Sequence, residues 1–158
     1  MKKLVYLLTC ICTIAGCGNH ITKKEYGKFN LLIQSRGPVI GYSPESDVEI
    51  LELDGYVFKD LNRNGRLDPY EDWRLDPMER ASDLASQMSI EQIAGLMLYS
   101  SHVKVEDTIP SDRVLSFLKE DHLRHVLVTK VKDAYTGAVW HNNVQAQMEA
   151  EPLGIPTN

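Results

Sequence analysis

The twelve-residue segment from Asp60 to Glu71 constrains this chain more than any other part of the sequence. It reads D-L-N-R-N-G-R-L-D-P-Y-E and has a residue that can supply oxygen at each position where a calcium loop of the EF-hand type needs one. Gly65 stands at the sharp turn, where a Cβ would obstruct the backbone. We therefore predict a Ca²⁺ site. Its predicted ligands are the side chains of Asp60, Asn62, Asn64, Asp68 and Glu71 and the backbone carbonyl of Arg66.

The alternative is an ordinary Asn-Gly turn beside a solvated acidic face. Such a turn requires neither Asp68 nor Glu71, so the complete pattern favours the ion, and oxygen ligands in a loop of this length favour calcium over magnesium. The residues before the loop alternate like two strands around Asp54-Gly55, which predicts a β-hairpin and not an entering helix. We therefore expect a hairpin with an EF-hand-like loop over residues 46–75, in which calcium acts as a structural clamp.

The N-terminus has the features of a bacterial lipoprotein signal. Two lysines precede an apolar run that is too short to span a bilayer comfortably, and the run ends in I-A-G-C at Cys17. We predict a signal peptide over residues 1–16 and acylation of Cys17. The lipid would anchor the chain in the cell envelope, at the outer membrane or in the periplasm. A plain secretory signal with an incidental cysteine is the alternative.

The next segment, residues 17–45, is polar and repeatedly broken by glycine and proline. We predict a tether followed by irregular chain, with a short strand at Phe29–Ile33. The net charge of −5 gives no basic excess that would attract a nucleic acid, so no nucleic-acid partner is expected.

Residues 76–158 have the pattern of a parallel α/β fold. Asp76, Ser89 and Ser111 are each placed to cap a helix, and apolar residues at helical spacing predict that the first two helices serve as scaffold, with their methionines filling the core. Residues 100–110 are predicted to be a loop. A buried strand over residues 122–129, a helix that begins at Asp133 or Thr136, and a second strand at L-G-I-P would form a βαβ unit.

Three stretches of the chain resemble glycoside hydrolase family 3, whose members include β-glucosidase-like enzymes. They are F-K-D-L-N-R-N-G-R-L-D-P-Y-E-D-W-R, R-A-S-D-L-A-S-Q-M-S-I-E-Q-I-A-G-L-M and W-H-N-N-V-Q-A-Q-M-E-A-E-P-L-G-I-P. The resemblance covers about residues 54 to 156. It implies that the chain is the N-terminal part of such an enzyme, and that residues 76–158 are the first helices and the first βαβ portion of a (β/α)₈ TIM-type barrel.

The resemblance further implies a retaining, exo-acting O-glycosyl hydrolase that removes terminal β-linked sugars from an oligosaccharide or glucoside substrate. In the family the aspartate nucleophile and the acid/base lie after the L-G-I-P strand, so no residue of this chain is predicted to be catalytic. A complete barrel needs roughly 250 residues, whereas this chain has 158. We therefore expect an incomplete barrel that is inactive and poorly stable alone.

A second hypothesis from a different functional class is a non-catalytic calcium-binding surface lipoprotein, complete in itself. Continuation of the reading frame past Asn158 into a barrel would support the enzyme, and a natural stop after a small closed fold would support the module.

Overall fold

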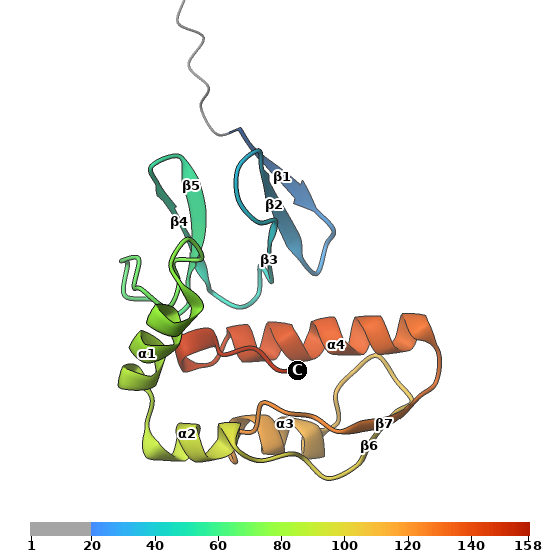
Figure 1. Cartoon of the computed structure of the whole chain (residues 1–158). Coiled ribbons are helices and arrows are strands. Elements are labelled where there is room, and N and C mark those ends of the chain that lie inside the picture. The colour runs from blue at the N-terminus through green and yellow to red at the C-terminus, as the bar shows by residue number, and fades with distance from the viewer. Residues whose placement is uncertain (1–19) are drawn as a thin grey trace, which may run out of the picture.

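The computed structural model describes residues 20–158, and it is a mixed α/β structure with small sheets and four α-helices (Figure 1). The predicted α/β class is confirmed at this level. The strands are β1 (Ile21–Glu25), β2 (Asn30–Gln34), β3 (Ile40–Tyr42), β4 (Glu49–Leu53), β5 (Tyr56–Asp60), β6 (Val103–Val105) and β7 (Val128–Val131). The helices are α1 (Pro77–Gln87), α2 (Ile90–Leu96), α3 (Asp112–Lys119) and α4 (Ala134–Glu149), followed by a 3₁₀ turn, η1 (Pro152–Gly154).

The prediction of a tether and irregular chain is wrong for residues 21–42, which form a three-stranded antiparallel sheet in the order β1-β2-β3. The short strand expected at Phe29–Ile33 is confirmed as β2, the central strand. The sequence does not predict β1, because this edge strand has four of its five residues exposed and therefore shows no alternation of apolar and polar residues. The inner face of this sheet packs Leu32 and Ile40 against Val57 of β5.

The predicted hairpin is confirmed as β4 and β5, which pair in antiparallel register with Leu53 opposite Tyr56. Asp54 and Gly55 form its turn with φ of 55° and 78°. Two successive positive φ values give the turn the twist that antiparallel strands prefer. β5 ends at Asp60, so the strand delivers the first residue of the predicted calcium loop.

The predicted starts of α1, α2 and α3 are confirmed. Asp76 accepts a hydrogen bond from the N–H of Met78, Ser89 and Gln92 form a reciprocal capping box, and Ser111 accepts from Val114. The prediction that the methionines of the first two helices fill the core is wrong for Met78 and Met97, which are 77% and 78% exposed. No other element of residues 20–158 covers these apolar positions.

The main core lies between α3, α4 and the parallel pair β6 and β7. It is built from Val103, Val105, Val114, Leu118, Trp140, Val144 and Met148. β6, α3 and β7 form a βαβ unit, since β6 and β7 are parallel and α3 lies between them in sequence. It is not the predicted unit, which placed α4 between β7 and L-G-I-P. Residues 103–105 were predicted to be loop, which is wrong, because a three-residue strand is too short to show a period.

Two further predictions for this region need correction. The strand begins at Val128 and not at residue 122, and three of its four residues are exposed. Within residues 20–158 it pairs only with β6, so its other edge is open. L-G-I-P is not a strand: Leu153 and Gly154 have φ of 67° and 53° and belong to η1. Asn158, after η1, nevertheless lies beside residues 124–126: its carbonyl accepts from the N–H of Val126, and its N–H donates to the carbonyl of Arg124.

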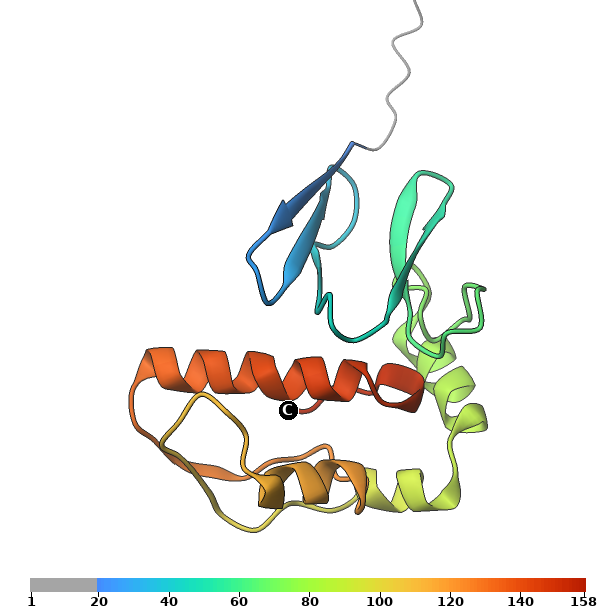
Figure 2. The ribbon, with the colours of Figure 1, turned by 180° about the vertical axis from the view of Figure 1, so that it is seen from behind.

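Helix α4 lies across the middle of the molecule, between the N-terminal strands and the layer that contains α2, α3, β6 and β7 (Figures 1 and 2). Asp133 caps this helix, accepting hydrogen bonds from both the backbone N–H and the hydroxyl of Thr136. Among residues 20–158, none of the helices has the length and apolar character needed to cross a bilayer.

Candidate functional site

The predicted calcium loop begins at Asp60, whose side chain is wholly buried at the end of β5. Its two carboxylate oxygens accept hydrogen bonds from the backbone N–H groups of Asn64, at 3.1 Å, and of Gly65, at 2.7 Å. These bonds curl the chain around the carboxylate. Gly65 has a φ of 73°, a left-handed conformation that a residue with a Cβ rarely adopts, which explains why glycine stands at this position.

Glu71 closes the loop from the other end. Its Oε1 accepts from the N–H groups of Leu61, at 2.6 Å, and Asn62, at 3.3 Å, while its Oε2 accepts from the N–H of Asp68, at 3.0 Å. Burial raises the pKa of the Glu71 carboxyl, against the opposing effect of these hydrogen bonds. Both ends of the twelve-residue segment are therefore tied to its backbone by carboxylates.

The carboxylate of Asp68 lies between these ends. Its Oδ2 accepts from the amide groups of Asn62, at 2.5 Å, and Asn64, at 2.8 Å. The N–H of Arg66 donates to Oδ1 of Asn64, at 2.8 Å. All six predicted ligand residues thus lie in one hydrogen-bonded loop, with Arg66 on its exposed side.

The loop concentrates negative charge without a cationic partner. Within residues 20–158, no Lys, Arg or His side chain forms an ion pair with Asp60, Asp68 or Glu71. No set of three or more His, Cys, Asp and Glu side chains in this part of the chain is gathered closely enough to hold a metal by itself. The predicted set of calcium ligands also includes the side-chain oxygens of Asn62 and Asn64 and a backbone carbonyl. Uncompensated carboxylates at a partly buried site fit a divalent cation.

Tyr70 is a residue of this loop that the sequence pattern did not single out. Its side chain is 5% exposed, and its hydroxyl has no hydrogen-bond partner in the part of the chain that the structure describes. Burial, together with the charges of Glu71, Asp68 and Asp60, raises the pKa of this hydroxyl. A buried hydroxyl without a partner beside three acids is consistent with a site that holds a further polar group, such as an ion or its water.

The loop is joined to helix α1 through polar contacts of its C-terminal half. The N–H of Tyr70 donates to Asp83, and the guanidinium of Arg80 donates to the Tyr70 carbonyl at 3.1 and 3.2 Å. The amide of Asn62 also reaches Oε1 of Gln87. The ring of Tyr70 packs with Leu153 and Ile155 near the C-terminal end of the chain. The loop therefore connects the hairpin, α1 and the segment that follows α4.

A second polar cluster surrounds Glu149, which the sequence analysis did not assign to a site. Its Oε1 lies 2.6 Å from Nζ of Lys59, and its Oε2 accepts from the N–H of Ser43, at 2.7 Å, and the hydroxyl of Ser46, at 2.9 Å. The sequence contains a signal that could have indicated this cluster, because Asn142, Gln145 and Glu149 recur at helical spacing on α4 and form a polar stripe.

The predicted signal peptide over residues 1–16 and the predicted acylation of Cys17 concern residues outside those that the structure describes.

Comparison with known proteins bears on function. No family model matches the chain. The chain is 52% identical over 121 residues to a protein of Dickeya chrysanthemi described as "Periplasmic beta-glucosidase/beta-xylosidase". The match covers 68% of this chain and 17% of that protein, so the chain spans about a sixth of the relative's length. The predicted resemblance to β-glucosidase-like glycosyl hydrolases is confirmed by this homology.

Proposed function

We propose that this chain, a relative of a periplasmic β-glucosidase/β-xylosidase, is the N-terminal part of an exo-acting retaining glycosidase that removes terminal β-linked sugars. The observation that carries the proposal is the 52% identity to that enzyme. The βαβ arrangement of β6, α3 and β7 supports the start of a barrel. We assign no catalytic residue to this chain, because the resemblance places the nucleophile and the acid/base after the L-G-I-P segment.

The proposal includes a structural calcium ion in the Asp60–Glu71 loop. The side chains of Asp60, Asn62, Asn64, Asp68 and Glu71 and the carbonyl of Arg66 would hold it. When bound, the ion supplies positive charge that offsets the repulsion among the three carboxylates. The loop continues from β5 of the hairpin at Asp60 and is hydrogen-bonded to α1. Its role is therefore to fix these elements to one another, and it takes no part in bond cleavage.

We also propose that the chain acts in the cell envelope, anchored through a lipid on Cys17. The periplasmic relative supports this location, as does the I-A-G-C motif at the end of the apolar N-terminal run.

A segment exchange tests the enzymatic proposal. The matched segment of the Dickeya chrysanthemi enzyme is replaced by the corresponding residues of this chain, and hydrolysis of an aryl β-glucoside and an aryl β-xyloside is measured. We expect the exchanged enzyme to hydrolyse at least one of the two, while the same enzyme without the segment does not. The 158-residue chain alone is expected to be inactive. An exchanged enzyme that folds but hydrolyses neither glycoside would contradict the proposal, as would hydrolysis by this chain alone.

A further inference from the structure

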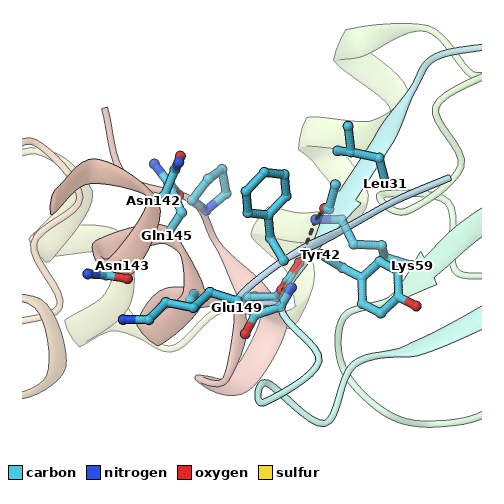
Figure 3. Close-up of a pocket in the computed structure, with 14 residues that line it drawn as sticks. Leu31, Tyr42, Lys59, Asn142, Asn143, Gln145 and Glu149 are labelled. Atoms are coloured by element: carbon cyan, nitrogen blue, oxygen red, sulfur yellow. Dashed lines mark hydrogen bonds and ion pairs between the residues drawn. The ribbon is translucent and has the colours of Figure 1, made fainter. Parts of the chain in front are cut away.

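A groove separates the N-terminal sheet from helix α4. Its volume is about 370 Å³, which lies in the range of small-molecule binding sites. Figure 3 shows Asn142, Gln145 and Glu149 on the α4 side of this groove, and Leu31 and Tyr42 on the other. The groove therefore has a polar wall and a wall of apolar and aromatic residues.

The apolar wall presents aromatic rings from two neighbouring segments. Phe29 precedes β2, and Tyr42 ends β3, and both line the groove with half-buried side chains. Tyr42 is held in place because it packs against the core of the sheet around Leu32 and Ile40. One face of the Phe29 ring is stacked on Tyr26, and the remaining aromatic faces suit contact with the apolar C–H faces of sugar rings.

The polar wall offers carboxamides, which both donate and accept hydrogen bonds as a sugar hydroxyl does. Asn142 is exposed, and its side chain forms no hydrogen bond within residues 20–158. The neighbouring Asn143 donates from Nδ2 to the carbonyl of Thr108, which fixes its orientation. A purely apolar ligand would leave such groups unpaired, at a cost in affinity.

The charges that line the groove are nearly balanced and form no cluster of cations that would select an anionic ligand. Lys59, which lines the groove, is already paired with Glu149. The polar wall is formed by the last two turns of α4, where the helix dipole is negative. Lys28 is the remaining cation among the lining residues, and it is exposed to solvent. The groove thus fits an uncharged ligand with many hydroxyl groups.

From these walls we infer that the groove between the N-terminal sheet and α4 binds a short, neutral β-linked oligosaccharide. Sugar rings lie against Phe29 and Tyr42, and their hydroxyls bond to Asn142. The choice of β-linked sugars as the ligand rests on the proposed function, whereas the preference for a neutral polyol rests on the groove itself.

Binding is tested with cellotriose and xylotriose by saturation-transfer difference NMR and calorimetry on the whole chain. We expect one of the two to bind, and the variants Phe29→Ala and Asn142→Ala each to weaken it about five-fold or more. The matched controls are Tyr135→Ala and Gln147→Ala, which remove an exposed aromatic ring and an exposed carboxamide of the same helix outside the groove. These controls are expected to bind like the unaltered chain. Asn142→Ala keeps the test decisive if Phe29→Ala unfolds, because the Asn142 side chain has no partner to lose.

The inference is overturned if neither trisaccharide binds, or if Asn142→Ala binds as tightly as the controls. It is also overturned if a trisaccharide of galacturonate, which is anionic, binds more tightly than the neutral sugars. The result is separable from the segment exchange. If the exchanged enzyme hydrolyses a glycoside but neither trisaccharide binds to this chain, only the inference of a sugar site in the groove is refuted. If a trisaccharide binds but the exchanged enzyme hydrolyses neither glycoside, only the enzymatic proposal is refuted.

Discussion

The Nζ atom of Lys59 lies 2.6 Å from Oε1 of Glu149, and this ion pair joins the N-terminal hairpin to the last turn of α4. The side chain of Glu149 is only 9% exposed, and its other oxygen is occupied by Ser43 and Ser46. The contact connects two segments that are 90 residues apart in sequence. Lys59 also donates to the carbonyl of Gly41 in β3, so the contact sets the spacing between the N-terminal sheet and α4, and therefore the width of the groove.

Replacing Glu149 by alanine is expected to destabilise the chain substantially. The change removes the ion-pair partner of Lys59, which keeps only its hydrogen bond to the carbonyl of Gly41, and it removes an acceptor of two buried donors, the N–H of Ser43 and the hydroxyl of Ser46. Because Lys59 is 30% exposed, we expect a loss of about 2–4 kcal/mol, somewhat below the value for a fully buried pair. Urea denaturation measures the loss. The matched control is Glu106→Ala, which breaks the exposed pair with Lys130 and should cost about 0.5 kcal/mol or less. Equal losses for the two variants would show that the Lys59–Glu149 pair does not hold the sheet to the helix.

Gly65→Ala is expected to cost roughly 1 kcal/mol in the presence of a chelator. A Cβ at this position meets no atom within 4 Å, so the cost comes from the positive φ alone. Gly27 has a φ of 78° and equally open surroundings, so Gly27→Ala is a matched control with the same expected loss. Only Gly65→Ala should also weaken calcium binding, measured by titration calorimetry. Equal calcium affinities for the two variants would argue against an ion that depends on this turn.

The stability of α4 is expected to depend on pH through Asp133. The N–H and hydroxyl of Thr136 hold the pKa of this carboxyl below its ordinary value. Because the pKa is lowered in the folded state, the Asp133 cap contributes its full stabilisation of the fold above the unfolded-state pKa of about 3.9. This stabilisation is lost as pH falls through the lower pKa of the folded state. Urea midpoints measured from about pH 2 to about pH 7 should show the loss on the acid side.

Asp133→Asn is the control for that titration, because asparagine keeps an oxygen for the Thr136 N–H but cannot be protonated in this range. The difference in stability between the two proteins should be constant above about pH 5 and should shift in favour of the variant below that. A difference that stays constant through the acid range would mean that the carboxylate charge of Asp133 does not stabilise the helix.

Local signals predicted the helix starts and the hairpin well, because their causes lie within a few residues. Asp76, Ser89 and Ser111 each satisfy backbone N–H groups two or three positions away, and the Asp54-Gly55 turn needs only its own φ values. The hydrogen bonds of the Asp60–Glu71 loop are local for the same reason. The sequence spacing therefore placed all six predicted ligand residues in one loop.

The features that the sequence did not reveal depend on distant partners. β6 is three residues long and exists because β7 pairs with it some 25 residues later. Glu149 acquires its role only when the fold brings Lys59 and Ser43 to it. The apolar stripe of α1 and α2 predicted burial, but apolar spacing specifies which residues share a face and not what covers that face. Met78 and Met97 are consequently exposed in residues 20–158.

Glu71→Gln provides the sharpest single substitution in the proposed calcium loop. It removes one charge and weakens closure of the loop by both carboxylate oxygens, so we expect lower calcium affinity and a lower melting temperature in calcium. In an enzyme that contains the segment, thermal stability should fall more than turnover. Collapse of turnover on a glucoside, with calcium binding and melting temperature unchanged, would show that the loop is not a structural clamp.

The most direct measurement is the melting temperature of the chain in calcium and in chelator, with magnesium at the same concentration as a control. At a calcium concentration about 100 times the dissociation constant, binding to the folded state adds about 2.7 kcal/mol. For a chain of this size that corresponds to a rise of roughly 5 to 10 °C. We predict this rise in calcium and a smaller one in magnesium. Identical melting temperatures in calcium and in chelator would contradict the proposal that Asp60–Glu71 is a calcium site that stabilises the fold.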